Sequence, residues 1–357
     1  MPDGGAGAET GGTSTGGTST GGTLTGGTST GGTSGTASGA AGTPPGTGGA
    51  QAGTGGGGGA SQGGAGGAQG GKSGSAGMGA AAGRGGAAGS NGSGGSGGAR
   101  PSGGCGKAPP ASMRYSIDVG GTMREYILAV PTNYDQNRPY RLIFGWHPLG
   151  GSAQQVAGTG NNGYYGLRGA SNGAAILVAP EGLPFQGTNL GWANTSGRDI
   201  AFLRAMLERF KGELCVDEAR IFSTGFSFGG MMSFAVGCAG LARAIAPMAG
   251  NTTVSGCENG TLPVAVMGFH GDDDTVVGID GGRRGRDIFV QRNQCMQQSM
   301  PAASTYCDGL GQNNQPCTCV SYPGCSEGYP VTWCEFNGPH TPAPSSAATI
   351  WSFFSQF

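Results

Sequence analysis

Residues 215–232, CVDEARIFSTGFSFGGMM, contain the most informative pattern in the chain. The apolar, β-branched run 219–226 predicts a strand, and 229–238 predicts a helix. Between them, residues 225–229 (GFSFG) have the Gly-x-Ser-x-Gly spacing of a nucleophile elbow, a tight strand-to-helix turn that holds a strained serine. Glycines suit this turn because side chains at the flanking positions would collide with neighbouring elements. Ser227 is therefore the candidate nucleophile.

Predicted strands and helices alternate on both sides of this turn. Further helices are expected at 199–211, where apolar residues recur with helical spacing, and at 345–357. Further strands are expected at 124–131, 141–147, 174–180, 244–249, 263–269 and 331–336. This alternation predicts an α/β fold with a mostly parallel sheet covered by helices on both faces. The loops at the carboxyl ends of such strands carry the functional site.

The chain has 357 residues, 81 of them glycine, and its first 104 residues differ sharply in composition from the rest. They repeat GGTST over 11–34, continue in Gly, Ala and Ser, and contain no Phe, Trp, Tyr, Val or Ile. Such a segment cannot bury enough apolar surface to offset a backbone entropy cost of roughly 1–2 kcal/mol per residue. We therefore expect 1–104 to be a disordered Gly/Thr/Ser/Ala linker, either a spacer or a tolerated expansion. Residues 105–357 have the length of one domain.

Charge and hydropathy exclude two classes of partner. The net charge is −1, and no stripe of Lys and Arg suggests binding to nucleic acid or an anionic membrane. No run approaches the ~18–20 apolar residues that a membrane span requires. We expect a domain that neither binds nucleic acid nor spans a membrane; its oligomeric state stays open, with a monomer favoured.

The ten cysteines indicate an oxidising compartment, because an even number in one domain is typical of disulfides. Metal binding is the alternative, but Cys317-x-Cys319 is not a usual zinc spacing, and we expect no metal. Pairing cannot be deduced from spacing, although Cys215 and Cys257 are possible partners near the elbow. A secreted or cell-surface protein is therefore expected. MPDGGAGAETGG lacks the features of a signal peptide, so either this start is internal to a longer precursor or export uses another route, and we favour the first.

A catalytic serine needs a base, and the chain has three histidines, His147, His270 and His340. In the elbow fold the order along the chain is serine, acid, histidine. His340 alone follows both Ser227 and an acid at a strand end, so it is the candidate base. The acid is expected just after the strand 263–269, among the three adjacent aspartates 272–274. Spacing does not choose among them, but one should turn inward while the others face water.

An oxyanion hole is expected from two backbone N–H groups. One belongs to Phe228, the residue after the nucleophile. The other comes from the loop after 141–147, and because Pro148 has no N–H, Leu149 is the better candidate. His147 is expected to order this loop. Trp192 and His147 are also candidate substrate-binding residues, with ordinary packing as the alternative for Trp192.

Together these motifs resemble the secreted feruloyl esterases and polyhydroxybutyrate depolymerase-like esterases of the α/β-hydrolase superfamily. The resemblance covers about 124–357, and the family pattern H-G-x-x-D-x-x-V makes Asp274 the acid, with Val277 completing the match. Tannase-like esterases are disfavoured, since they place cysteines where this chain has Phe226 and Pro339. The motifs concerned are FGWHPLGG (144–151), GWANTSGRDIAF (191–202), CVDEARIFSTGFSFGGMM (215–232), HGDDDTVV (270–277) and GPHTPAP (338–344).

The resemblance implies a serine carboxylic-ester hydrolase that needs no metal or organic cofactor. The expected substrate is a polymer-linked ester, with release of ferulate or a related hydroxycinnamate from plant cell-wall polysaccharide. A poly(3-hydroxybutyrate) depolymerase or an acetylxylan esterase is the alternative within enzymes. The non-enzymatic alternative is a surface-displayed binding module on an inactive hydrolase scaffold, which would have no physical need for Ser227, Asp274 and His340.

Overall fold

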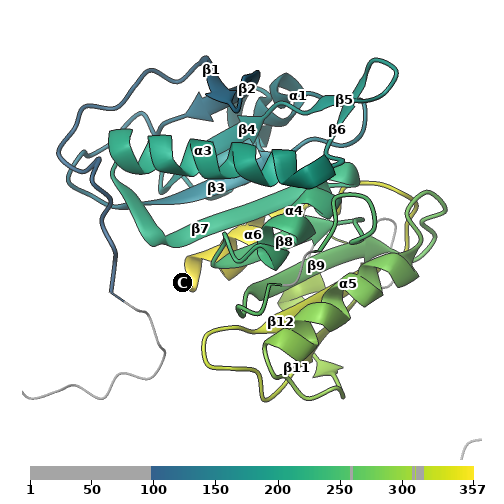
Figure 1. The fold of residues 1–357 in the computed structure, drawn as a ribbon. Coiled ribbons are helices and arrows are strands. Elements are labelled where there is room, and N and C mark those ends of the chain that lie inside the picture. Colours follow the sequence, from purple (N-terminus) through teal and green to yellow (C-terminus); the bar gives the residue numbers. More distant parts are fainter. Residues whose placement is uncertain (1–97, 258–259, 308–309, 311–316) are drawn as a thin grey trace, which may run out of the picture. The chain divides into compact units, whose positions relative to one another are not determined.

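The structure is a computed structural model that describes residues 98–257, 260–307, 310 and 317–357. Residues 1–97, most of the expected linker, lie outside the described part. The described chain is built around a ten-stranded sheet with the order β1-β2-β4-β3-β7-β8-β9-β12-β11-β10 (Figure 1). The six strands from β4 to β12 pair in parallel, and the outer strands pair antiparallel. The expected mostly parallel sheet is confirmed.

The central strands β4, β8 and β9 are buried along their whole length. A separate hairpin of β5 (Leu183–Gln186) and β6 (Asn189–Gly191) lies outside the sheet. The sheet strands are β1 (Arg114–Val119), β2 (Thr122–Ala129), β3 (Tyr140–Trp146), β4 (Ala175–Pro180), β7 (Val216–Phe226), β8 (Ala244–Met248), β9 (Ala265–Gly271), β10 (Met300–Pro301), β11 (Cys317–Tyr322) and β12 (Val331–Phe336).

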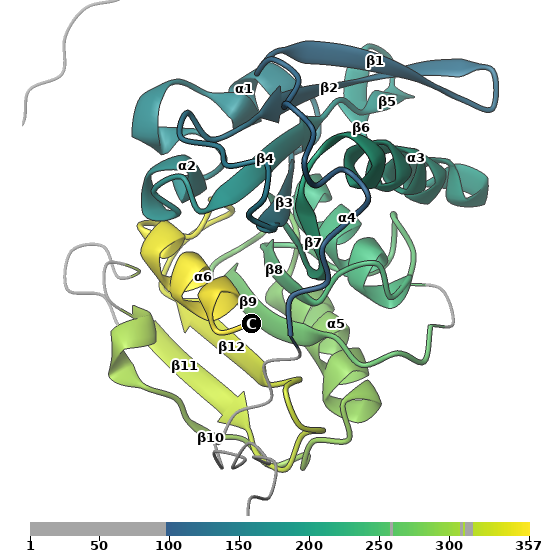
Figure 2. The same cartoon turned by 90° about the vertical axis from the view of Figure 1, so that its left-hand side faces the viewer.

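Helices cover both faces of the sheet, as expected. Helices α3, α4 and α5 lie on one face, and α1, α2 and α6 lie on the other (Figure 2). Each face has its own buried apolar cluster. No described helix is long and apolar enough to cross a membrane. The helices are α1 (Ala153–Ala157), α2 (Leu167–Ala170), α3 (Arg198–Glu213), α4 (Phe228–Cys238), α5 (Ile279–Arg292) and α6 (Ser346–Ser355), with short 3₁₀ turns at Gly160–Asn162, Thr195–Gly197 and Ser304–Cys307.

Helix α5 has no counterpart among the predicted elements. Its sequence, IDGGRRGRDIFVQR, is rich in Gly and Arg and lacks a continuous apolar stripe. The structure explains the glycines, because they let the helix lie close to its neighbours. A Cβ on Gly282 would collide with the His270 ring, and one on Gly285 would lie 2.8 Å from the Phe234 ring. Tertiary contact, rather than helix propensity, therefore accounts for this composition.

The folded part of the chain begins before Cys105. Pro101 forms a β-bridge with Asp217, and the Arg100 amide donates to the Asp217 carboxylate at 3.0 Å. Ser102 is buried and donates its hydroxyl to the Leu214 carbonyl oxygen at 2.6 Å. Residues 100–102, which lie before the expected boundary at 104 and 105, thus contact the start of β7 and Leu214, contacts that composition does not show.

All ten cysteines are paired, which confirms the expectation of disulfides. The suggested pairing of Cys215 with Cys257 is wrong. Cys215 instead binds Cys105 across a separation of 110 residues, and Cys257 binds Cys238. The other three bridges, in the segment before and within β12, are Cys295–Cys325, Cys307–Cys317 and Cys319–Cys334.

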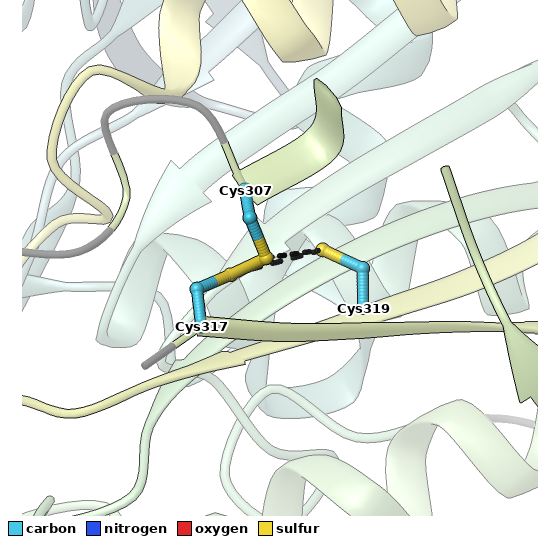
Figure 3. Close-up of side chains that lie close together, drawn as sticks. All are labelled: Cys307, Cys317 and Cys319. Atoms are coloured by element: carbon cyan, nitrogen blue, oxygen red, sulfur yellow. Dashed lines mark hydrogen bonds between the residues drawn. A yellow bond between two sulfur atoms is a disulfide. The ribbon is translucent and has the colours of Figure 1, made fainter. Parts of the chain in front are cut away.

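Three cysteine sulfurs gather near the start of β11. The sulfur atoms of Cys307, Cys317 and Cys319 all lie within 4.8 Å of one another (Figure 3). However, Cys307 and Cys317 form one disulfide, and Cys319 is bound to Cys334. Because metals bind the free thiolate, this oxidised cluster offers no metal ligand, and its role is to staple the β11 region.

Candidate active site

Ser227 lies in the tight turn between β7 and α4. Its backbone has φ 57° and ψ −117°, a conformation in which a residue with a Cβ is strained. A Cβ on Gly225 would lie 2.8 Å from the Trp146 carbonyl oxygen, and one on Gly229 would collide with the same oxygen. The two glycines therefore let the turn pass close to the end of β3. This close approach is the physical reason for the Gly-x-Ser-x-Gly spacing.

The structure brings together the three side chains singled out in the sequence. The Ser227 hydroxyl lies 2.8 Å from His340 Nε2, to which it can donate. His340 Nδ1 lies 2.7 Å from Asp274 Oδ2 and donates its N–H to that oxygen. This chain of two hydrogen bonds orients a base toward the nucleophile and an acid toward the base, which is the geometry of a serine hydrolase triad.

Asp274 is the inward-facing member of the three adjacent aspartates. Asp272 and Asp273 are exposed, whereas Asp274 is buried. Its Oδ1 accepts the Val276 amide at 2.9 Å and the Val277 amide at 2.8 Å. The loop after β9 thus folds around this carboxylate and leaves its Oδ2 toward His340.

His340 lies in the loop that follows β12, next to β9 in the sheet. Its imidazole packs against the Phe226 ring at a centroid distance of 4.7 Å. Phe226 was not singled out in the sequence as part of the site, because its position before the serine only shows that it ends a strand. The structure shows that it supports the face of the base.

Two amides near Ser227 are available to an oxyanion. Phe228 is the first residue of α4, so its N–H has no intrahelical acceptor. After β3, the Gly150 amide donates to the Leu190 carbonyl and the Gly151 amide to the Pro148 carbonyl. Over the described residues, no acceptor is found for the Leu149 amide. Of the loop's N–H groups, that of Leu149 is thus the one left for a ligand.

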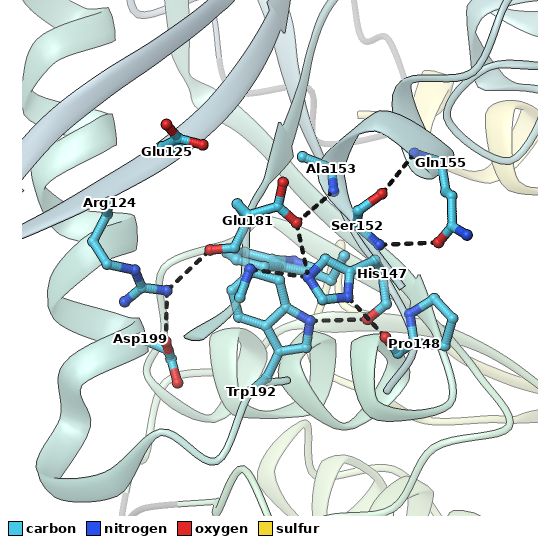
Figure 4. Close-up of polar contacts among 12 residues, drawn as sticks. Arg124, Glu125, His147, Pro148, Ser152, Ala153, Gln155, Glu181, Trp192 and Asp199 are labelled. Atoms are coloured by element: carbon cyan, nitrogen blue, oxygen red, sulfur yellow. Dashed lines mark hydrogen bonds and ion pairs between the residues drawn. The ribbon is translucent and has the colours of Figure 1, made fainter. Parts of the chain in front are cut away.

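His147 orders this loop from inside the protein. Its Nδ1 lies 2.7 Å from the Pro148 carbonyl oxygen, and its Nε2 accepts the Gly182 amide at 2.9 Å (Figure 4). A carbonyl oxygen only accepts, so the ring must carry its proton on Nδ1. Glu181 extends the network, because its Oε1 accepts the Ala153 amide at the start of α1. This buried network holds both ends of the loop that contains Leu149.

Trp192 also belongs to the support of this loop. Its indole N–H donates to the His147 carbonyl oxygen at 2.9 Å, and its ring packs edge-on against Trp146 at 4.9 Å. Both Trp192 and His147 are 0% exposed. The expectation that these two side chains contact substrate is therefore corrected, since neither presents a surface to a ligand, and both act by holding the loop.

The exposed apolar surface beside Ser227 comes instead from Phe185, which the sequence did not single out, and from Leu149, which it singled out only for its amide. Phe185, on the β5–β6 hairpin, packs edge-on against Phe228 at 5.1 Å and is 39% exposed. Leu149 is 41% exposed, and its side chain and the Phe228 ring both approach Gly191. A Cβ at Gly191 would collide with that ring. The turn at 187–188 between two short apolar runs was the available signal for this hairpin.

The two fully buried histidines predict a loss of stability on mild acidification. Burial lowers the pKa of both His147 and His270 below the usual 6.5. In the unfolded chain both protonate near their usual pKa, so the unfolded state binds more protons as the pH falls below about 6.5. We expect the free energy of unfolding to fall by up to about 1.4 kcal/mol per pH unit for each histidine.

Urea unfolding measured between pH 7.5 and 5.5 checks this expectation. His270→Gln, which removes one of the two groups, should roughly halve the slope. A wild-type stability that is flat over this interval would contradict it.

The chain was compared with known proteins. No family model matches it. Feruloyl esterase D of Neurospora crassa is 40% identical over 272 residues, which are 71% of this chain and 89% of that protein. Feruloyl esterase C of Emericella nidulans is 39% identical over 259 residues, which are 70% of this chain and 89% of that protein. Among solved structures, an acetyl xylan esterase from Aspergillus awamori superposes with a TM-score of 0.51 at 16% identity, over 68% of this chain and 99% of that one, and shows the fold alone.

Proposed function

Because the chain belongs to the feruloyl esterase C and D family, we propose that it releases ferulate or a related hydroxycinnamate from esters of plant cell-wall polysaccharide. The protein is a carboxylic ester hydrolase. The observation that supports the catalytic assignment is the continuous hydrogen-bonded path from the Ser227 hydroxyl through His340 to Asp274. A binding module would have no need for this alignment, so the path argues against the non-enzymatic reading.

The proposed reaction is acyl transfer through Ser227. The Ser227 oxygen attacks the ester carbonyl carbon while His340 Nε2 takes the hydroxyl proton. Asp274 holds His340 in the tautomer with a proton on Nδ1 and stabilises the imidazolium that forms. His340 then donates its proton to the leaving alcohol oxygen, and the acyl group remains on the serine. A water molecule, deprotonated by His340, attacks the acyl-enzyme in the second half and frees the acid.

Backbone amides stabilise the negative charge that develops on the carbonyl oxygen of the ester. We assign this role to the N–H groups of Phe228 and Leu149, which have no acceptor within the described chain. Phe228 also brings the N-terminal end of α4, whose dipole favours negative charge. The network around His147 contributes by fixing the Leu149 loop before substrate arrives. Such preorganisation lowers the cost of stabilising the transition state.

The aromatic acyl group is placed against the exposed apolar side chains beside Ser227. The exposed Leu149 and Phe185 offer a surface suited to a planar, apolar ring; Phe185 packs on the buried Phe228 ring, which approaches Gly191 together with the Leu149 side chain. This surface supports a hydroxycinnamoyl ester over a small acetyl ester, which would leave it uncovered. The five disulfides are typical of proteins of oxidising compartments and support this proposal. We propose action outside the cell on polymer-linked esters.

Side-by-side hydrolysis of methyl ferulate, acetylated xylan and poly(3-hydroxybutyrate) tests the proposal. We expect release of ferulate with little turnover of the other two, and labelling of Ser227 by a serine-reactive phosphonate. Clearing of the polyester, or release of acetate alone, would move the protein to one of the other esterase activities. No turnover and no labelling would overturn the assignment of an enzyme.

A further inference from the structure

His270 is a buried histidine in contact with the acid of the site. It lies near the end of β9, four residues before Asp274, and is 0% exposed. Its Nε2 is 2.7 Å from the Val277 carbonyl oxygen and 3.2 Å from Asp274 Oδ2. That Asp274 oxygen is the one that His340 Nδ1 contacts. The proposed mechanism gives His270 no role, although it lies next to the reacting side chains.

The geometry determines which nitrogen of His270 carries the proton. The Val277 carbonyl oxygen can only accept a hydrogen bond, so Nε2 must be the donor. Nδ1 is buried and has no hydrogen-bond partner in the described part of the chain. A second proton on Nδ1 would therefore bury an unpaired donor and a charge, which is costly. His270 is thus held as the neutral tautomer with its proton on Nε2.

With this tautomer, Asp274 meets four N–H donors. The Val276 and Val277 amides donate to Oδ1, and His340 Nδ1 and His270 Nε2 face Oδ2. An ionised carboxylate has about four lone-pair sites, so three hydrogen bonds and the 3.2 Å contact with His270 Nε2 match its capacity. The His270 N–H also anchors the Val277 carbonyl and so closes the loop 274–277 around the carboxylate.

We propose that His270 is a positioning residue for the triad acid, Asp274. The His270 Nε2–H is shared between the Val277 carbonyl oxygen and the Asp274 oxygen that binds His340. The inference rests on the proposed catalytic role of Asp274. His270 fixes the rotation of the carboxylate and offsets part of the negative charge that faces His340. It keeps Oδ2 from binding the His340 imidazolium too strongly, so that the proton remains available to the leaving alcohol.

Other charged groups near His270 do not offer the same contact. Glu335 on β12 is paired with His270 in the parallel register, but its carboxylate binds Arg283 of α5 at 2.6 Å. Arg283 also contacts Asp280 on the same helix. The titratable groups that face His270 directly are therefore Asp274 and His340, and Gly282 of α5 covers its Nδ1 side.

Two amide substitutions of His270 distinguish the effect of losing the Nε2–H donor from the effect of changing the size of the side chain. His270→Gln places an amide nitrogen at about the position of Nε2, whereas His270→Asn reaches only as far as Nδ1. We expect His270→Asn to lower kcat for methyl ferulate roughly tenfold with KM changed less than about twofold. We expect His270→Gln to retain kcat within about threefold. Trp333→Phe, which alters packing beside the His270 ring without touching Asp274, is the control and should keep kcat within about twofold.

The pH profile gives a readout that a purely structural role would not move. Loss of a donor leaves more negative charge on Asp274 toward His340, so the acidic limb of kcat/KM should move up by roughly 0.5 pH unit in His270→Asn and stay in place in His270→Gln. Equal effects of Gln and Asn, or a wild-type profile in His270→Asn, would overturn the proposal. Thermal unfolding of each variant is measured alongside.

The tautomer is measured in the wild-type chain and needs no variant. Nitrogen-15 NMR of histidine-labelled protein should show His270 neutral with its proton on Nε2 between pH 6 and 8. A proton on Nδ1 would overturn the proposal even if His270→Asn fails to fold. This measurement is also independent of substrate. If methyl ferulate is not hydrolysed at all, the proposed function fails, while the NMR result still decides whether His270 presents its Nε2–H to Asp274.

Discussion

Replacing Ser227 with Ala is expected to lower kcat for methyl ferulate by roughly 10⁴–10⁶-fold. The variant loses the oxygen that forms the acyl-enzyme, and His340 and Asp274 then have no nucleophile to activate. The phosphonate label should disappear as well. KM should change little, because the apolar surface around Gly191 and the two free amides remain. Rates of ferulate release, with thermal unfolding to verify the fold, provide the measurement.

Ser233 offers a matched control on the helix that follows Ser227. It is fully buried in α4, and its hydroxyl lies 3.0 Å from the Ser223 hydroxyl rather than near His340. Ser233→Ala removes the same atom type six residues further along the chain and should leave kcat within about twofold. Retention of more than about a hundredth of wild-type activity in Ser227→Ala would mean that another group is the nucleophile.

The second large effect is expected for Asp274→Asn, with a fall in kcat of roughly 10⁴-fold. All four groups around this carboxylate are N–H donors, from Val276, Val277, His270 and His340. An amide would bring its NH₂ against two of these donors whichever way it turned. If the NH₂ faced His340, that ring would be driven to the tautomer with its proton on Nε2, which cannot accept the Ser227 proton.

The same conflict predicts a loss of stability, because at least one buried N–H loses its acceptor. We expect the free energy of unfolding to fall by about 1–3 kcal/mol, measured by urea unfolding. Asp273→Asn is the matched control, since this neighbouring aspartate is exposed, and it should preserve both stability and kcat. If Asp273→Asn were instead the inactive variant, the assignment of the acid to Asp274 would fail.

The elements nearest the site were the most predictable from sequence. The strands 219–226 and 331–336 and the helix after Ser227 correspond to β7, β12 and α4 with small shifts of their ends. Their apolar residues lie in short segments that alternate along the chain with loops and helices, and the glycine spacing around Ser227 marks the turn, which together give a clear local signal. Helix α5 gave no such signal, because its glycines are required by close contacts with residues of other strands and helices.

For the disulfides too, the sequence predicted that they form but not which cysteines pair. The even number of cysteines predicted disulfides, but Cys215 binds Cys105 rather than Cys257. Pairing depends on which sulfur atoms lie close together in the assembled fold. The number and type of residues between two cysteines do not determine the spatial distance between their sulfur atoms.

The sequence by itself determined the class of fold and its Ser–acid–His order, because periodicity and the glycine spacing of the elbow are local properties of the chain. The family pattern pointed to Asp274 and the position of His147 to a role in its loop; only the tertiary structure decided that Trp192 and His147 are fully buried and that His270 meets Asp274. These choices depend on loops from separate strands meeting at one edge of the sheet. Their distances follow from packing between elements far apart in sequence, which no local pattern records.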